Sequence, residues 1–346
     1  MPITKLNIEE FLRLNIILDV RSPGEYEHAH IPEAISLPLF TNEERKVVGT
    51  AYKQESREKA IKIGLDYFGT KTVKIIETVE KIVSERKIAK EVGLHCWRGG
   101  MRSAAVAWLL DLYGFKVYLL TGGYKIYRHW VLEQFTKKYD LQILGGYTGS
   151  NKTGLVQELK KKKESVIDLE MLAGHKGSAF GNLDHLPQPS QEMFENLLAK
   201  ELFSISFAKK NIWLEDESQR IGLINIPLPF YHNMRNSAVV FLNIPFEERL
   251  NHIIVDYGNF SKEKIINAII RIKKKLGGLE TKTAINFLLE DDVRNCFAVL
   301  LKYYDKLYLR NTYKRENAEK IITQIDLTTV DVNINSEKII EHVNNR

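Results

Sequence analysis

Short apolar runs that end in turn residues alternate with amphipathic stretches along the first part of the chain. Residues 16–20 (IILDV) form a branched apolar run that stops at RSPGEY, and residues 91–96 (EVGLHC) and 115–120 (FKVYLL) follow the same pattern. Between the last two runs, residues 101–114 carry apolar side chains at helical spacing and end at Gly114. Buried strands joined by a helix predict a βαβ unit, and therefore an α/β domain with a mainly parallel sheet.

The same alternation begins again after residue 140. Strands are predicted at 141–146 (LQILGG), 165–170 (SVIDLE), 211–217 (NIWLEDE) and 238–245 (AVVFLNIP), and a helix at 152–163. From about residue 246 the pattern is helical and rich in lysine. We therefore predict an α/β protein with three regions: a parallel-sheet domain over 1–135, a second parallel-sheet domain over 136–245, and a mainly helical, basic region over 246–346.

The composition is that of a soluble globular protein. Of the 346 residues, 44% are hydrophobic and 27% are charged. The first residues lack the basic and apolar pattern of a leader, and no apolar run reaches the roughly 20 residues that span a bilayer. We expect a cytoplasmic protein with no membrane partner. The net charge of +6 permits a polyanionic partner without requiring one.

Only two cysteines occur, Cys96 and Cys296. No Cys-x-x-Cys pair or Cys/His cluster accompanies them, so the sequence predicts neither a disulfide framework nor a zinc site. No metal site is firmly predicted.

Cys96 stands where a predicted parallel strand ends and a helix begins. In open α/β sheets ligands bind at that edge. Backbone N–H groups of the loop, with Arg98, Gly99, Gly100 and Arg102, form an arrangement that favours an anion and lowers the pKa of a thiol. We therefore expect Cys96 to be a nucleophilic thiolate. The alternative is a buried structural cysteine at a strand end.

Residues 146–153 (GYTGSNKT) fit the phosphate-loop pattern G-x-x-x-x-G-K-[ST] except at Asn151, which replaces a glycine. Asparagine tolerates the left-handed conformation that this position requires. We expect this loop to bind phosphate or diphosphate rather than to support vigorous ATP hydrolysis; an ordinary strand-to-helix turn is the alternative. The predicted diphosphate ligands are Gly146, Thr148, Gly149, Ser150, Asn151, Lys152 and Thr153.

Polar residues near the ends of later strands are further candidates. Asp168 and Glu170 follow the strand predicted after the phosphate loop and suit Mg²⁺ or its water. His175 lies in the stretch 173–181 (AGHKGSAFG), which suits a loop closing over a ligand, and Arg220 suits a phosphate contact. A surface loop and a structural ion pair are the alternatives. All four are candidates for Mg²⁺ or substrate contacts.

The helical region after residue 246 combines lysines with tyrosines. Lys273 to Lys275 lie close to Arg271, and residues 300–315 (LLKYYDKLYLRNTYKR) interleave tyrosines with basic residues. Such a mixture suits neutralisation of an RNA backbone and stacking on unpaired bases. Tyrosines four residues apart also pack helices, so the pattern leaves both interpretations open.

Several motifs resemble a known family. Residues 19–34 (DVRSPGEYEHAHIPEA), followed by a strand-end cysteine, resemble the rhodanese fold, in which the cysteine carries sulfur or selenium. HCWRGGMRS (95–103) together with a phosphate loop is similar to bacterial tRNA 2-selenouridine synthases. So are NEERKVVGTAYKQ (42–54), GLDYF (64–68), TGGYKIYR (121–128), DLEMLAGHKGSAFG (168–181), QPSQEMFENLL (188–198) and WLEDESQRIGLINIP (213–227). One departure is Glu33, where rhodaneses commonly have glycine.

The resemblance implies a rhodanese-like domain, a P-loop NTPase-like domain and a two-step transferase. The enzyme would attach a geranyl group from geranyl diphosphate to the sulfur of 2-thiouridine at the wobble position of tRNA, and then exchange that sulfur for selenium from selenophosphate. Lys152 would neutralise the diphosphate. Cys96 would hold a perselenide or position the selenophosphate, with Arg98 and Arg102 on its anionic group. Mg²⁺ is a candidate cofactor.

Two other classes of protein stay open. Cys96, five residues and Arg102 have the spacing of a cysteine phosphatase, so the first domain could be a rhodanese-fold phosphatase or sulfurtransferase with a regulatory nucleotide-binding domain. A nucleotide-dependent signalling module with an inert first domain is the third hypothesis. The transferase is favoured because it alone uses the cysteine loop, the phosphate loop, the acidic strand ends and the basic region together.

Overall fold

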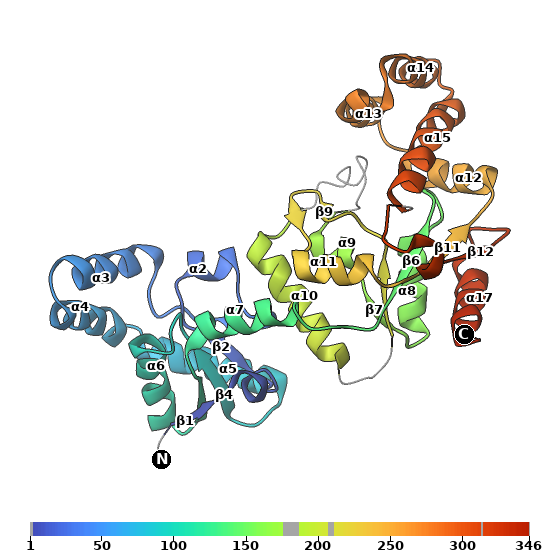
Figure 1. Ribbon diagram of the computed structural model, residues 1–346. Coiled ribbons are helices and arrows are strands. Elements are labelled where there is room, and N and C mark those ends of the chain that lie inside the picture. The colour runs from blue at the N-terminus through green and yellow to red at the C-terminus, as the bar shows by residue number, and fades with distance from the viewer. Residues whose placement is uncertain (1–2, 176–186, 207–210, 313, 346) are drawn as a thin grey trace. The chain divides into compact units, whose positions relative to one another are not determined.

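The computed structural model describes residues 3–175, 187–206, 211–312 and 314–345. The chain divides into two compact units, one of Met1–Gln134 with Glu195–Leu197, the other of Phe135–Phe194 with Leu198–Arg346. Each unit has its own parallel sheet (Figure 1). The α/β prediction is therefore confirmed.

The first unit is built on a five-stranded sheet in the order β1-β5-β4-β2-β3, with every pair parallel. The strands are β1 (Thr4–Leu6), β2 (Ile17–Asp19), β3 (Ile35–Ser36), β4 (Glu91–His95) and β5 (Lys116–Leu120). The three strands predicted from apolar runs, β2, β4 and β5, are the central ones. Side chains of β2 and β4 are largely buried, because helices cover both faces of a parallel sheet.

Seven helices complete the first unit: α1 (Ile8–Phe11), α2 (Pro23–His28), α3 (Asn42–Gln54), α4 (Arg57–Gly69), α5 (Thr72–Arg86), α6 (Met101–Leu112) and α7 (Gly123–Gln134). Helix α6 is the helix predicted at 101–114. Helix α3 starts with a capping box, in which Thr41 accepts from the Glu44 N–H and Glu44 from the Thr41 N–H. The core centres on residues such as Leu18, Leu94 and Leu110.

The second unit contains a five-stranded parallel sheet in the order β12-β11-β6-β8-β7. Its strands are β6 (Leu141–Gly146), β7 (Ser165–Ile167), β8 (Ile212–Glu215), β11 (Ala238–Asn243) and β12 (Ile322–Asp326), and a hairpin adds β9 (Arg220–Ile221) and β10 (Ile224–Asn225). The sequence pattern did not predict β12, which lies in the mainly helical region. Its alternate residues are half-buried at the sheet edge, so its apolar signal is weak.

The helices of the second unit are α8 (Lys152–Lys161), α9 (Leu169–Ala173), α10 (Gln191–Ser206), α11 (Leu228–Arg235), α12 (Phe246–Tyr257), α13 (Lys262–Leu276), α14 (Gly278–Leu289), α15 (Val293–Thr312), α16 (Ala318–Ile321) and α17 (Val332–Asn344). Helices α12 to α15 share a separate apolar core that includes Ile269, Leu288 and Leu300. The region after residue 246 is thus mainly helical, as expected. Among the described residues, no helix has the length and apolarity needed to cross a membrane.

The segment 165–170 differs from its prediction. The strand ends at Ile167, and Asp168 is the N-cap of α9, where its side chain accepts from the Met171 N–H. An aspartate favours the start of a helix over a continued strand, because its side chain can accept a hydrogen bond from the backbone N–H three residues later. In the loop expected at 173–181, residues 176–181 lie outside the described part of the chain.

Candidate functional site

The first candidate site is the loop that joins β4 to α6. It begins at Cys96, whose side chain is 3% exposed. The thiol sulfur accepts hydrogen bonds from the Gly100 N–H and from the Ser103 hydroxyl, both at 3.3 Å. Burial alone would raise the pKa of the thiol, but the hydrogen bonds from Ser103 and Gly100 and the charge of Arg102 lower it below its ordinary value. The arrangement favours a thiolate, as the sequence predicts.

The start of α7 holds this loop in place. The Tyr124 N–H donates to the Cys96 carbonyl at 2.8 Å, and the Lys125 N–H donates to the Trp97 carbonyl at 2.9 Å. Gly123 adopts φ 62°, and a Cβ there would lie 2.4 Å from the Cys96 carbonyl oxygen. A glycine is therefore required at this close approach, which gives the TGGYKIYR motif a role that its sequence alone did not reveal.

The two arginines of the loop have different environments. Arg98 is exposed, and no ion pair links it to any residue in the described part of the chain. Arg102 donates from Nη1 to Glu25 Oε2 at 2.8 Å, and Arg45 also pairs with Glu25. Burial would raise the pKa of Glu25, but the Arg102 hydrogen bond and charge lower it to about 2. Glu25 thus fixes Arg102 beside the loop, while Arg98 keeps its donors for a ligand.

A buried polar group lies under the loop. Arg21 donates from Nη2 to Asp19 Oδ2 at 2.6 Å and to the Ala29 carbonyl at 2.8 Å, and its guanidinium stacks on Tyr124 at 3.7 Å from the ring centroid. His95 is fully buried, with no hydrogen-bond partner on either ring nitrogen. Burial lowers its pKa to about 4. His95 is therefore a neutral packing residue at the strand end.

The second candidate site is the loop between β6 and α8. Asn151 adopts φ 54° and ψ 41°, the left-handed conformation predicted for it. Gly149 is at φ 83°, where a Cβ would lie 2.8 Å from the Arg249 carbonyl. Lys152 Nζ donates to the Gly146 carbonyl at 3.0 Å, as the lysine of a phosphate loop does when it folds back over the loop. The loop geometry of a phosphate site is thus present despite the missing glycine.

Two residues that the sequence analysis missed support this loop. Arg249 donates from Nη1 to the Thr148 carbonyl at 3.0 Å and forms a two-pronged ion pair with Asp305. The Tyr308 hydroxyl accepts from the Gly146 N–H at 3.3 Å and donates to Asp216 at 2.9 Å. Both lie more than 90 residues from the loop in the chain, and no local pattern links them to it.

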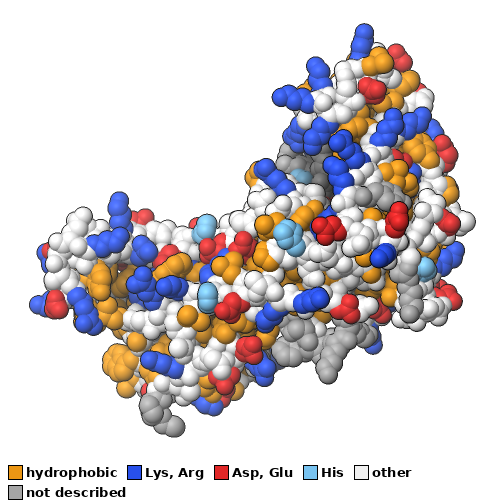
Figure 2. Space-filling model, viewed as in Figure 1, with side chains coloured by type: hydrophobic (Ala, Val, Ile, Leu, Met, Phe, Trp, Pro, Cys, Tyr) orange, Lys and Arg blue, Asp and Glu red, His pale blue; other side chains and the backbone are white. Residues whose placement is uncertain are grey.

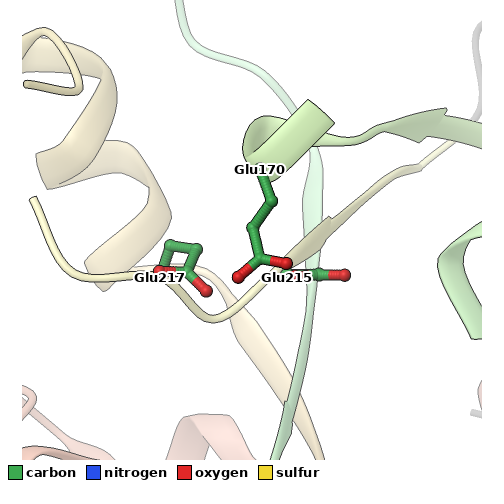
Figure 3. Close-up of side chains that lie close together, drawn as sticks. All are labelled: Glu170, Glu215 and Glu217. Atoms are coloured by element: carbon green, nitrogen blue, oxygen red, sulfur yellow. The ribbon is translucent and has the colours of Figure 1, made fainter. Parts of the chain in front are cut away.

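Three glutamates meet beside the phosphate loop. Glu170 comes from the first turn of α9, Glu215 from the last residue of β8, and Glu217 from the segment after it; one carboxylate oxygen of each lies within 4.8 Å of the others. Figure 3 shows the side chains of the three glutamates lying close together, with Glu170 reaching toward the other two. Glu170 also accepts from the Thr153 hydroxyl at 3.1 Å. Glu215 and Glu217 stand two residues apart at the end of a predicted strand, in WLEDE (213–217), which is a pattern that could have identified them. From the sequence, only Arg220 in that segment was assigned a role.

The electrostatics of this cluster are unfavourable for three bare carboxylates. Burial and the charge of Glu170 raise the pKa of Glu217 to about 8 and that of Glu215 well above its ordinary value. Glu215 is 1% exposed, and its Oε1 has no hydrogen-bond partner. The cluster must therefore hold protons or a cation. Carboxylate oxygens with a threonine hydroxyl nearby are the donor set of a hard divalent cation such as Mg²⁺.

The other sequence candidates lie elsewhere. Asp168 caps α9 and accepts from Gln157 at 2.7 Å, so both its oxygens have structural partners. His175 lies against the turn at Gly222, since a Cβ on that glycine would be 2.8 Å from the imidazole. Arg220 is exposed and donates to the Gly222 carbonyl. Of the four candidates for Mg²⁺ or substrate contacts, only Glu170 lines the pocket at the phosphate loop.

That pocket has a volume of about 660 Å³ and is lined by two chemically different sets of residues. One set is the phosphate loop with Lys152 and the three glutamates. The other comes from α12 and α15 and is largely apolar and aromatic, with His252, Asp256 and Thr312 as its polar members; the apolar and aromatic residues are Ile253, Tyr257, Tyr304, Leu307 and Tyr308. A pocket of this size and division suits a ligand with a phosphate end and an apolar body.

Comparisons with known proteins cover both units. Residues 5–129 match the model of the rhodanese-like domain, and residues 139–338 match the model of the tRNA 2-selenouridine synthase AAA domain. The chain is 30% identical to the tRNA 2-selenouridine synthase of Nitrosomonas eutropha over 87% of its own length and 89% of the relative's. It is 31% identical to that of Shewanella halifaxensis over 94% and 97%. With the Nitrosomonas europaea enzyme it shares 36% identity over 70% of its own length, a match that spans only 63% of that relative.

Proposed function

Because the chain belongs to the tRNA 2-selenouridine synthase family, we propose that it modifies the wobble uridine of tRNA in two steps. In the first step a geranyl group passes from geranyl diphosphate to the sulfur of 2-thiouridine. In the second step selenium from selenophosphate replaces the geranylated sulfur. The protein is then a transferase with one site in each unit.

The divided pocket at the phosphate loop is the observation that carries the first step. The loop N–H groups and Lys152 suit a diphosphate, and the aromatic wall of α12 and α15 suits an isoprenoid chain. The new bond joins the thiouridine sulfur to C1 of the geranyl group, and the C1–O bond breaks as diphosphate leaves. Lys152 would stabilise the charge that develops on the leaving oxygen.

The three glutamates provide a fitting place for Mg²⁺ in this step. Glu170, Glu215 and Glu217 would hold the ion, with the Thr153 hydroxyl beside it. When bound, Mg²⁺ would neutralise part of the diphosphate charge. This set differs from the sequence-based pair Asp168 and Glu170, because Asp168 caps α9 and Glu215 and Glu217 lie closer to Glu170.

The Cys96 loop supports the second step. Its lowered thiol pKa, the exposed Arg98 and the oriented Arg102 suit the anionic selenium reagent, whose phosphate group is tetrahedral. The selenium atom of selenophosphate forms a C–Se bond at C2 of the base, the C2–S bond breaks, and the sulfur leaves with its geranyl group as a thiolate. Water then attacks phosphorus, the P–Se bond breaks, phosphate is released, and the selenium stays on C2. Alkylation in the first step makes that sulfur a better leaving group.

The experiment that tests this proposal follows the nucleoside mass through both steps. The purified protein is incubated with an anticodon stem-loop that contains 2-thiouridine, first with geranyl diphosphate and then with selenophosphate. We expect gain of a geranyl group and then its exchange for selenium. An unchanged nucleoside, with Cys96-dependent release of phosphate from an aryl phosphate ester, would instead identify a cysteine phosphatase.

A further inference from the structure

The first unit contains a second pocket, to which neither geranylation nor selenium exchange assigns a role. It has a volume of about 120 Å³ and lies between α3, α4 and the first turns of α6. Its lining is apolar except for one charged side chain, Arg102. The apolar residues that line it include Phe40, Val48, Tyr52, Ile61, Leu65, Phe68, Met101 and Ala105.

This pocket is close to the reactive sulfur. Met101, Arg102 and Ala105 line it from α6, while Ser103 in the same first turn donates to Cys96. Because a helix with its side chains is about 10 Å across, the pocket lies within about that distance of the thiol. The pocket and the Cys96 loop therefore flank one turn of one helix.

The pocket also explains two motifs that the reaction did not use. Val48 and Tyr52 belong to NEERKVVGTAYKQ on α3, and Gly64, Leu65 and Phe68 belong to GLDYF on α4. These helices pack on each other as a hairpin. Figure 2 shows hydrophobic side chains gathered on this face of the first unit, with Lys and Arg side chains beside them.

Large apolar side chains stay exposed at the pocket. Tyr52 is 54% exposed, Leu65 56% and Met101 50%. Leaving apolar surface in water is unfavourable, so an exposed apolar group around a concave pocket marks a place where an apolar ligand binds. Arg102 lines the pocket and adds positive charge at this surface. An apolar cavity beside basic groups is complementary to a hydrocarbon chain attached to a polyanion.

We propose that this pocket binds the prenyl chain of the S-geranylated nucleoside while its sulfur is exchanged for selenium at the Cys96 loop. The inference rests on the proposed function, because it requires a prenylated RNA as the substrate of the second step. An apolar cavity of about 150 Å³ holds a benzene molecule, so this pocket has the size of one isoprene unit.

The pocket thereby orients the reacting carbon. Anchoring the chain on one side of α6 directs the C–S bond toward the Cys96 loop on the other, and the geranyl thiolate leaves into an apolar environment. The selenium stays at the oxidation level at which selenophosphate supplies it, since one nucleophile replaces another at C2 and no electrons are transferred. Recognition of the chain also lets the site distinguish a geranylated tRNA from an unmodified one.

The test uses the full-length protein and a stem-loop that already carries S-geranyl-2-thiouridine. Leu65→Lys places a charge at the pocket on a side chain that is already exposed. Leu112→Lys makes the same change at a residue of α6 that is 70% exposed and lies outside the pocket. A stem-loop with S-methyl-2-thiouridine serves as the second substrate, because it has the same leaving atom without the chain.

We expect Leu65→Lys to lower kcat/KM for selenium exchange on the S-geranyl stem-loop by about tenfold or more, since hydrophobic pockets discriminate by such factors. Its activity on the S-methyl stem-loop and its rate of geranylation should equal those of the wild type. Without selenophosphate, its affinity for the S-geranyl stem-loop should fall by a similar factor. Leu112→Lys should match the wild type throughout.

Equal kcat/KM and affinity of Leu65→Lys and wild type on the S-geranyl stem-loop would overturn the pocket assignment and leave the proposed function standing. So would an equal loss on the geranyl and methyl substrates, which would indicate damage to the Cys96 loop. A wild-type protein that cannot exchange selenium into the S-geranyl stem-loop would refute the proposed function itself.

Discussion

The Cys96 loop and the phosphate loop begin from the same local structure and reach opposite electrostatic states. In both, a buried parallel strand ends in a glycine-containing loop that leads into a helix. Around Cys96 the buried and half-buried charges are paired, Glu25 with Arg102 and Asp19 with Arg21, and only the exposed Arg98 has no ion pair among the described residues. Beside the phosphate loop three carboxylates crowd together with raised pKa values. The charges at the first loop are largely balanced within the protein, whereas the carboxylates at the second require protons or a cation.

The difference comes from distant parts of the chain. The Cys96 loop is held by backbone N–H groups of α7, which begins 27 residues later in the sequence. The phosphate loop is held by Arg249 and Tyr308, and its acids come from α9 and the end of β8. The comparison shows that two loops at strand ends acquire different electrostatics, a thiol of lowered pKa in one and an acidic cluster in the other, from the residues that pack beside them.

The largest expected effect separates the two sites functionally. Cys96→Ser should lower selenium exchange by about a thousandfold or more and leave geranylation nearly unchanged, since a neutral hydroxyl cannot replace the thiolate that the loop presents to the selenium reagent. Lys152→Ala should lower geranylation by about 10²–10³-fold and spare selenium exchange on a pre-geranylated stem-loop. Mass spectrometry of the nucleosides measures both rates. Loss of both steps in either well-folded variant would contradict this division.

The next effect tests whether the Cys96 loop depends on its close backbone approach. Gly123→Ala should destabilise the first unit by about 2–3 kcal/mol, because its φ of 62° and the contact with the Cys96 carbonyl both disfavour a Cβ. Gly100→Ala is the matched control, since no atom lies within 4 Å of its Cβ position. Denaturant unfolding, monitored by a signal from the first unit, measures the free energy of unfolding of each variant. Equal stabilities of the two variants would refute the role given to Gly123.

A smaller effect concerns the carboxylate cluster in the second unit. Without divalent cations, Glu217→Gln should stabilise this unit by about 1 kcal/mol at pH 8 and above, because it removes one charge from a repulsive group. Added Mg²⁺ should stabilise the wild type more than the variant. Thermal unfolding with and without Mg²⁺ tests this expectation. A variant that is less stable than the wild type in the absence of metal would contradict it.

The two units should respond to pH in opposite directions. The pKa of Glu217 is raised from 4.5 to about 8, so the metal-free second unit should lose stability as the pH rises from about 4.5 to 8. In the first unit, burial lowers the pKa of His95 from 6.5 to about 4, so stability should fall as the pH drops through that interval. Hydrogen exchange resolved by peptide can follow each unit separately. If the stability of both units changed with pH in the same direction, Glu217 and His95 would not dominate the pH dependence.

The smallest effect compares two positions where a left-handed backbone carries a residue other than glycine. Glu33 has φ 68° and stands where rhodaneses commonly have glycine, and Asn151 has φ 54° where phosphate loops have glycine. Glu33→Gly should stabilise the first unit by a few tenths to about 1 kcal/mol. Asn151→Gly should change the second unit less, because asparagine tolerates this conformation and donates to the Val330 carbonyl. Unfolding curves of each variant and the wild type show whether the two glycine substitutions change the free energy of unfolding by different amounts.

The local patterns determined much of the architecture. Apolar runs bounded by turn residues identified the central strands β2, β4, β5, β6, β8 and β11, because buried parallel strands are almost entirely apolar. The edge strand β12 escaped prediction, since half-buried strands have a weaker pattern. The strand predicted at 165–170 stopped at Ile167, since the local capping preference of Asp168 prevailed over the apolar pattern.

The sequence by itself also determined the reactive groups that lie within one short segment. Cys96, Arg98 and Arg102 belong to one loop and its helix, and Asn151, Lys152 and Thr153 to another, so their spacing is enough to make them candidates. Only the tertiary structure decided which distant groups join them. It brought Glu215 and Glu217 to Glu170, moved Asp168 into a cap, and placed Tyr52 and Leu65 near Cys96. The physical reason is that local propensities act over a few residues, whereas burial and charge interactions act between whichever elements the packing brings together.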